Sequence, residues 1–314
     1  MIHIFPSFFP HFACKADHCL HTCCQTWEID IDPETEKRYR ETEGPLGKEL
    51  SEWMKTSEDG STCFRLNEKG YCHFLTEKGL CRLYLEKGPS YMCDICTAHP
   101  RFYKYTFNPM TDEDVELSGT GLCCERTVEQ IFGLKGPITF STTEGKRVSM
   151  EEILHILGSD SEPGYNHFIP EFEEVDARLL LKRLFETEPI DTAWTENLSF
   201  LKNHLPVLLP KLKRLAGKYR FYFDNLYQYI LFRQLDRLES YDLSILIRYV
   251  DESIFFILLE IARTGDPLRA PARWSEQIEY DTDNVTILLD SIAEEYGYGE
   301  NEIGPDPEFY YEKR

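Results

Sequence analysis

SYDLSILIRYVDESIFFILLEIARTG, residues 240–265, decides the class of fold. Its apolar residues recur at the spacing of one face of an α-helix, and they are Leu246, Val250, Ile254, Ile257 and Ile261. Gly265 follows this pattern and Pro267 lies just beyond it, as such residues do after many helices. The stretch therefore predicts a helix over residues 240–264 that buries one face in a core.

Helical spacing continues on both sides of this stretch. Further helices are expected over residues 149–157, 173–187, 191–204, 218–238 and 272–296. We therefore expect a mainly α protein with an α-helical domain over residues 147–314, which could hold a protein substrate. Residues 133–146 are rich in Gly, Ser and Thr and are predicted to be a linker.

Residues 1–133 predict a different, mostly irregular region. Asp32 and Pro33 have the residue types of an N-cap and first helical position, so a short helix should run from there to about Thr42. A second helix to about Lys55 should follow the break at Gly44-Pro45. Further along, the sequence predicts a small β-hairpin with strands at residues 102–107 and 115–117. A helix over residues 123–132 is expected to follow it.

All 11 cysteines of the chain lie in this first region. They are Cys14, Cys19, Cys23, Cys24, Cys63, Cys72, Cys81, Cys93, Cys96, Cys123 and Cys124. The count is odd and no export signal is visible, which argues against a disulfide framework. The concentration of thiols instead predicts a metal or iron–sulfur site, and adjacent Cys23 and Cys24 would serve different sites or one cluster with a partner from elsewhere.

Three of the cysteines begin the units of an internal repeat over residues 63–89, CFRLNEKGY, CHFLTEKGL and CRLYLEKGP. Each unit carries Glu-Lys-Gly at positions six to eight, and glycine after a polar pair suits a turn with positive φ. If the units are structurally equivalent, Cys63, Cys72 and Cys81 occupy matching places.

Composition and charge exclude several classes of function. The net charge of −21 leaves no basic stripe for nucleic acid, and no stretch is long and apolar enough to cross a membrane. The excess of carboxylates serves solubility, or attracts a basic substrate group such as a lysine. We expect a cytoplasmic protein with no nucleic-acid or membrane partner.

The cysteine series resembles the flagellin lysine-N-methylase family, itself related to zinc- or iron-chelating cysteine-cluster proteins. The matching pieces are Phe12-x-Cys14, Cys23-Cys24-x2-Trp27-x-Ile29-x-Ile31-Asp32, Gly70-x-Cys72-x-Phe74-Leu75, Leu80-Cys81, Cys96-x2-His99-Pro100-Arg101, Leu117-Ser118-x4-Cys123-x-Glu125, and FDNLYQYILFR at residues 223–233. The resemblance covers most of the chain, and the cysteine series is specific as a set.

The resemblance implies a ligand set, carried over residue by residue. Its members are Cys14, Cys19, Cys23, Cys24, Cys72, Cys81, Cys96 and Cys123. Eight thiolates permit two four-thiolate sites, or one cluster with structural thiols. Cys63, Cys93 and Cys124 are then additional, although the repeat argues for Cys63. Two positions depart from the family pattern: His99 replaces an aromatic residue, and so becomes a candidate ligand, and Cys124 replaces a proline.

The activity that the resemblance implies is methyl transfer from S-adenosylmethionine to lysine side chains of flagellin or another protein, with a [4Fe–4S] cluster, or zinc as the alternative metal. Gly119 and Gly121 lie between a predicted strand and helix and are weak candidates for a cofactor-cradling turn. Asp224 and Tyr229, in the resembling helical segment, are weak candidates for proton transfer, and the more ordinary explanation of them is helix packing and solvated polar faces. The alternatives are a non-enzymatic zinc- or iron-binding protein, and a cluster-dependent redox or radical enzyme that modifies another peptide.

Overall fold

The computed structural model describes residues 1–27, 29–57, 60–159 and 173–295. The chain divides into two compact units, and neither is one continuous stretch of sequence. Unit 1 comprises Met1–Phe12, Tyr103–Cys123 and Thr127–Arg314, and unit 2 comprises Ala13–Phe102 and Cys124–Arg126. The predicted linker, residues 133–146, lies inside unit 1.

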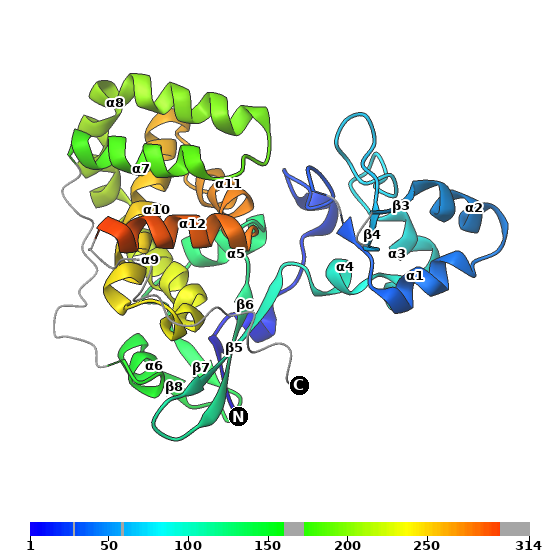
Figure 1. The fold of residues 1–314 in the computed structure, drawn as a ribbon, viewed down its shortest axis with the longest axis horizontal. Coiled ribbons are helices and arrows are strands. Elements are labelled where there is room, and N and C mark those ends of the chain that lie inside the picture. The colour runs from blue at the N-terminus through cyan, green and yellow to red at the C-terminus, as the bar shows by residue number, and fades with distance from the viewer. Residues whose placement is uncertain (28, 58–59, 160–172, 296–314) are drawn as a thin grey trace. The chain divides into compact units, whose positions relative to one another are not determined.

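Unit 1 contains a five-stranded sheet in the order β5-β6-β1-β7-β8 (Figure 1). The strands are β1 Ile2–Pro6, β5 Arg101–Asn108, β6 Glu113–Thr120, β7 Phe140–Thr142 and β8 Arg147–Val148. Strand β1 runs parallel to β6 and antiparallel to β7, while β8 pairs antiparallel with β7. The first strand of the chain is therefore central in a sheet whose other strands lie within residues 101–148.

Two predictions for this region were wrong, and one is confirmed. The mostly irregular region predicted for residues 1–133 begins with a regular strand, because Ile2–Pro6 pairs with β6 and β7. Residues 133–146 are not a linker, because β7 lies within them and buries Phe140. Both strands are short, so their apolar residues are too few to set a periodicity. The predicted hairpin is present as neighbouring β5 and β6, joined by a turn in which the Asp112 N–H donates to the carbonyl of Asn108 at 2.8 Å.

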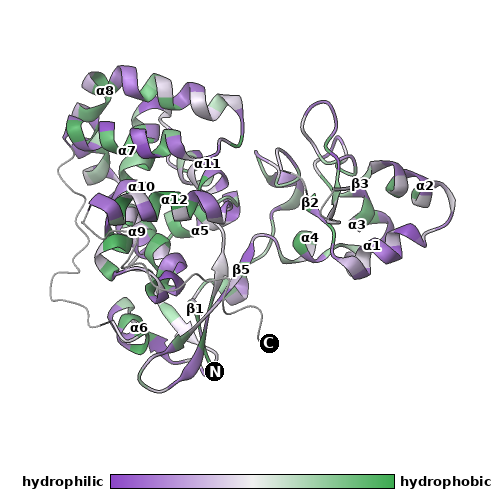
Figure 2. Ribbon diagram, viewed as in Figure 1, coloured by the Kyte–Doolittle hydropathy of each residue, from purple (hydrophilic) through white to green (hydrophobic). Residues whose placement is uncertain are grey.

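The rest of unit 1 is mainly helical, so the expected mainly α class is confirmed at that level. The helices that follow the hairpin are α5 Glu125–Phe132, α6 Met150–Ile156, α7 Glu174–Glu186, α8 Thr192–Lys218, α9 Arg220–Gln234, η4 Leu235–Glu239, α10 Leu243–Thr264, α11 Arg269–Gln277 and α12 Thr282–Glu295. Figure 2 shows hydrophobic and hydrophilic segments alternating along α8, as expected of a surface helix with one buried side. Among the described helices, none is both long and apolar enough to cross a bilayer.

Helix α10 is confirmed as a core element. Its five predicted apolar residues are all buried, and Gly265 ends the helix in the left-handed conformation with φ of 77°. Two other helix predictions were wrong in extent. Helix α8 continues to Lys218 through Pro206 and Pro210. The predicted helix 272–296 is two helices that meet at residues 278–281, and its predicted last residue lies outside the described ranges.

Polar side chains of α9 fasten the sheet of unit 1 to the helices. The buried Tyr229 hydroxyl donates to the Thr120 carbonyl at 2.5 Å and accepts from the N–H of the same residue at 2.8 Å. The side chain of Asn225 accepts from the Ile138 N–H at 2.7 Å and donates to the Gly136 carbonyl at 3.0 Å. Buried backbone groups at the end of β6 and before β7 are thereby satisfied.

A buried charge cluster ties α7 to α10. The guanidinium of Arg183, 2% exposed, pairs with Glu252 and also with Glu295. Arg248 reaches the Glu252 carboxylate from the next turn of α10 at 3.0 Å. Burial raises the pKa of Glu252, although both arginines act to lower it. Glu252 can therefore carry its negative charge in this buried position only because the arginines pair with it.

Unit 2 is a small sheet surrounded by short helices. Its strands, in the order β2-β4-β3, are β2 Ile29–Asp30, β3 Met54–Thr56 and β4 Thr62–Phe64. Its helices are η2 Ala16–His18, α1 Pro33–Arg40, α2 Gly44–Trp53, α3 Arg82–Lys87, η3 Pro89–Tyr91 and α4 Asp94–Ala98. The prediction of two helices between Pro33 and Lys55 is confirmed, with Asp32 as N-cap of the first. The second begins at Gly44 itself.

The repeat over residues 63–89 is confirmed for the turns of its first two units, but the three cysteines do not occupy equivalent places. Leu66 forms a bridge with Cys72, and Leu75 forms the equivalent bridge with Cys81. Both turns close on a glycine with positive φ, at Gly70 and Gly79. The third unit differs because α3 follows its cysteine, and Cys63 differs because it lies within strand β4.

Candidate functional site

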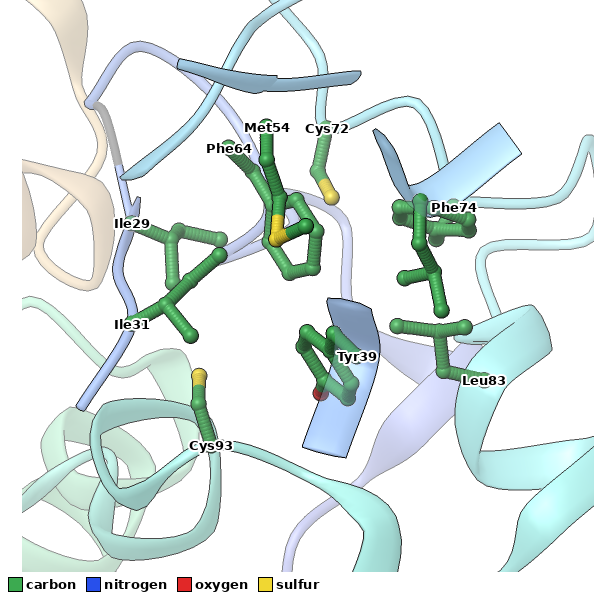
Figure 3. Packing of buried hydrophobic residues seen from close by; sticks show 10 residues of the cluster. Ile29, Ile31, Tyr39, Met54, Phe64, Cys72, Phe74, Leu83 and Cys93 are labelled. Atoms are coloured by element: carbon green, nitrogen blue, oxygen red, sulfur yellow. The ribbon is translucent and has the colours of Figure 1, made fainter. Parts of the chain in front are cut away.

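Five cysteines meet in the hydrophobic core of unit 2, and we call them the inner cysteine group. They are Cys24, Cys72, Cys81, Cys93 and Cys96. Cys72 and Cys93 are 6% and 0% exposed, and the other three pack against the same cluster. Figure 3 shows the side chains of Cys72 and Cys93 pointing into this cluster, among Ile31, Tyr39 and Phe64.

Local structure explains how separate segments deliver these five cysteines. The Cys72 N–H donates to the Cys24 carbonyl at 2.8 Å, which joins the first cysteine loop to the repeat. The β-bridge between Leu75 and Cys81 fixes the position of Cys81, which is the N-cap residue of α3. Cys93 is the N-cap residue of α4 and Cys96 lies one turn later, so both sulfur atoms project from one side of that helix.

Electrostatics show that the inner thiols are close enough to influence one another. Burial raises the pKa of Cys72 to about 12, and the neighbouring Cys24 and Cys81 add to the increase. Burial and Cys24 also raise the pKa of Cys81. A hydrogen bond between Cys93 and Cys96 lowers the pKa of Cys93 and raises that of Cys96. Several thiolates in this core would repel one another unless a cation lay among them.

A second set, the outer cysteine group, surrounds the start of α5. Its members are Cys14, Cys19, Cys23 and Cys124. The Glu125 carboxylate organises it by accepting hydrogen bonds from the Lys15 ammonium at 2.9 Å and from the N–H groups of Leu20 and His21 at 3.1 and 2.6 Å. The loop over residues 14–21 is thereby closed against the residue that follows Cys124.

The outer thiols also lie within electrostatic reach of one another. Burial raises the pKa of Cys19 to about 11, and Glu125, Cys124 and Cys14 each contribute to the increase. Cys23 hydrogen-bonds to Cys24 of the inner group, which lowers the pKa of Cys24 to about 7 and raises that of Cys23. Adjacent Cys23 and Cys24 are therefore the point where the two groups touch, and whether they serve one site or two stays a prediction.

The remaining two cysteines lie in other elements. Cys63 is buried in β4, where it pairs with Asp30 of β2 and Lys55 of β3. Cys123 belongs to unit 1. Burial acts to lower the pKa of Arg233 there, but the charges of Glu279, Tyr280 and Cys123 raise it. Seven of the eight cysteines named by the resemblance thus lie in unit 2, together with Cys93 and Cys124.

The grouping of cysteines does not by itself amount to a single-ion site. Among the described residues, no three or more histidine, cysteine, aspartate or glutamate side chains are arranged to hold one metal ion. A single zinc ion needs its thiolates about 2.3 Å from one point, whereas the cysteines of an iron–sulfur cluster bind different irons. The donor set of the inner group, thiols in an apolar shell, fits the chemistry of such a cluster. His99, the candidate fourth ligand, packs edge-on against Trp27 with ring centroids 5.5 Å apart.

Of the candidate cofactor turn, Gly119 lies within strand β6, and Gly121 is closely surrounded by side chains. A Cβ atom at Gly121 would lie 3.0 Å from Nη1 of Arg233 and 3.0–3.1 Å from the ring and hydroxyl of Tyr280. This glycine therefore permits close side-chain packing, and the turn does not fit an open cradle for S-adenosylmethionine at that point.

The two candidates for proton transfer lie on α9 in different settings. Tyr229 is fully buried and its hydroxyl is engaged by Thr120, which is a structural role. Asp224 is partly exposed, with Arg220 at 4.0 Å. Sequence reasoning missed Asp251 on α10, a half-buried carboxylate whose pKa burial raises to about 6 and which accepts a hydrogen bond from Tyr227. The adjacent acids Asp251 and Glu252, beside the apolar run of α10, are the signal that could have found it.

The meaning of these sites rests on their own chemistry. Thiols, a half-buried carboxylate and a neighbouring tyrosine are groups that ligate metals or move protons. The chain was also compared with protein-family models, with curated proteins and with solved structures, and no match was found in any of the three comparisons.

Proposed function

We propose that the chain is an iron–sulfur protein-lysine N-methyltransferase that acts on flagellin in the cytoplasm. The observation that carries the proposal is the meeting of five cysteines, from three separate stretches of sequence, in one apolar core. Single buried cysteines commonly pack as small apolar groups, so it is the meeting of five in one place, more than the four that a cluster needs, that supports the proposal. The sequence motifs that resemble flagellin lysine-N-methylases supply the reaction class.

The inner cysteine group would hold the cluster. It offers one thiol more than the four that a [4Fe–4S] cluster takes. Cys93 joins the set on geometric grounds, because it lies at the N-terminus of α4 beside Cys96. The outer group supplies four further thiols, for a second site or a structural role.

The chemistry requires a neutral lysine amine. A lysine with an ordinary pKa of about 10.4 is protonated at neutral pH and must lose a proton before it can attack a methyl sulfonium. In S-adenosylmethionine that sulfonium is the methyl donor. Asp251 is suited to receive the proton, because its pKa of about 6 keeps it ionised at neutral pH and Tyr227 holds its carboxylate by a hydrogen bond. The close packing at Gly121 does not fit the cofactor, so no step is assigned to this turn.

Anaerobic purification followed by iron, sulfide and zinc analysis tests the metal. We expect a brown protein whose iron is lost in Cys93→Ser and kept in Cys63→Ser, a matched control because both cysteines are buried. Cys124→Ser distinguishes one cluster from two, since it should lower iron content only if the outer group binds a second cluster. Zinc without sulfide would overturn the iron–sulfur assignment.

The reaction is tested separately with unmethylated flagellin and S-adenosylmethionine. Mass spectrometry should show lysine residues heavier by whole methyl units with the wild-type protein and a much smaller yield with Asp251→Asn. Metal bound without any methylated lysine would favour the alternative of a metal-binding protein. Modification of another residue type would favour the redox or radical alternative.

A further inference from the structure

Strand β5 exposes three aromatic side chains on one face. Tyr103, Tyr105 and Phe107 are 48%, 63% and 44% exposed, and we call them the aromatic stripe. The side chains between them turn inward, where Lys104 pairs with Asp236 at 2.8 Å and Thr106 is buried. This alternation is that of a strand with one packed and one open face.

The same strand forms an edge of its sheet among the described strands. An edge strand presents backbone N–H and C=O groups that can pair with another extended chain. Proteins usually protect such edges with charged residues or proline on the open side. Here the open side carries aromatic residues, and an exposed apolar surface of this kind commonly marks a binding site.

The apolar surface extends past the stripe to two phenylalanines of the same unit. Phe9 packs against Tyr103 with ring centroids 6.4 Å apart, and Phe5 packs against Phe9 at 5.9 Å. Figure 1 shows β5 and β6 as a long hairpin, so the stripe runs along an accessible element of the sheet.

Carboxylates flank the stripe. Glu116 of β6 accepts a hydrogen bond from Tyr105 and lies 3.3 Å from the ring of His3. Asp112, Glu113 and Asp114 are exposed at the turn of the hairpin. An ammonium group near this surface would meet both negative charge and aromatic faces, the two features that attract cations.

We propose that the edge of β5 and its aromatic stripe dock an extended, lysine-bearing segment of the protein substrate by strand addition. The proposal rests on the proposed function. Backbone hydrogen bonds to β5 would give affinity, and the stripe and carboxylates would select alternate basic side chains. A second copy of this chain is disfavoured at the same place, because each copy carries a net charge of −21 and the same acidic turn.

Fluorescence anisotropy with the full-length protein tests the docking directly. The probe is a labelled twelve-residue peptide of alternating threonine and lysine, compared with one in which glutamate replaces lysine. Tyr105→Ser should weaken binding of the lysine peptide about tenfold, the effect of losing one aromatic contact with a cation. Phe221→Ser, which removes an aromatic residue that is 71% exposed on α9, should leave binding unchanged.

A peptide methylated on alternate backbone nitrogens tests strand addition, and it should bind much more weakly if the pairing with β5 is real. Equal binding of the glutamate peptide, equal binding of the N-methylated peptide, or equal loss in Phe221→Ser would each overturn the proposal. A wild-type dimer in solution that Tyr105→Ser dissociates would also overturn it, in favour of a second copy.

Binding is measured without a methyl donor, so the two proposals fail independently. Peptide binding that depends on the stripe, without any methylation, would support the docking surface and contradict the proposed methyltransferase activity. Methylation of flagellin with an unchanged KM in Tyr105→Ser would support the proposed methyltransferase activity and contradict the docking surface.

Discussion

The carboxylate of Asp32 accepts a hydrogen bond from the backbone N–H of Asp94 at 3.0 Å. Its other oxygen accepts from the Thr35 N–H at 2.8 Å. One side chain therefore caps two helices, α1 and α4, and the second of these carries Cys93 and Cys96. Although burial acts in the opposite direction, these hydrogen bonds lower the pKa of Asp32. The position of α4 depends on a residue more than 60 positions earlier in the chain.

Replacing Asp32 with alanine should destabilise unit 2 and weaken metal binding by the inner group. Loss of one N-cap costs about 1 kcal/mol, and here two helix ends lose their acceptor. Urea unfolding and iron content measure the two effects. Glu34→Ala, an exposed change of the same charge in the first turn of α1, is the control and should have the smaller effect. Equal effects of the two variants would contradict the double cap.

Gly121→Ala should destabilise unit 1 by about 1–3 kcal/mol. The added methyl group would lie 3.0 Å from Arg233 and Tyr280. Moving side chains in a packed interior to make room for such a group typically costs this much free energy. Gly136→Ala is the matched control, since its Cβ would meet nothing within 4 Å. Thermal unfolding of both variants measures the difference. A cofactor cradle at Gly121 would instead show a loss of S-adenosylmethionine binding with unchanged stability.

Asp251→Asn should stabilise the protein at alkaline pH and not at acid pH. The pKa of Asp251 is about 6 in the folded protein and 3.8 ordinarily, so folding favours its protonated form. The contribution of protonated Asp251 to the free energy of unfolding is complete below pH 4 and is lost as the pH rises through 6. Asparagine mimics the protonated form and should add up to about 3 kcal/mol at pH 8. Urea unfolding at pH 4 and pH 8 measures this, and an equal gain at both values would refute the shifted pKa.

Arg183→Met should destabilise unit 1 by about 3 kcal/mol. The change leaves the carboxylate of Glu252 buried, with Arg248 as its remaining partner. Arg178→Met on the same helix is the control, because its pair with Glu174 is solvent-exposed and such pairs contribute about 0–1 kcal/mol. Guanidinium unfolding compares the two. A small effect of Arg183→Met would mean that the methionine packs as well as the ion pair.

The helices of unit 1 could be predicted because their signal is long and local. The apolar residues of α10 recur over six turns of helix, and the glycine that ends it is adjacent in sequence. Short strands carry no such signal. Strand β7 has three residues and β8 has two, and both exist only because β1 lies beside β7. Long-range pairing, which no local pattern encodes, made residues 133–146 part of a sheet.

The site was predictable in its chemistry but not in its membership. Residue type alone indicated thiol chemistry in residues 14–124. Which thiols share a core depends on contacts such as that of Asp32 with Asp94, which brings Cys93 to the inner group. The separation of Cys123 from Cys124 into different units likewise follows from the folding of distant segments around Glu125.

The insertion of unit 2 between β1 and β5 sets an order of events during biosynthesis. As the ribosome releases the chain, Cys24, Cys72, Cys81, Cys93 and Cys96 emerge before the partners of β1 exist, so the inner group can collapse first. Cys124 arrives later, with Glu125 and the last residues of β6. A released fragment that ends near residue 110 should therefore already bind the proposed cluster through the inner group, whereas the outer group and the parallel pairing of β1 need residues that come later in the chain.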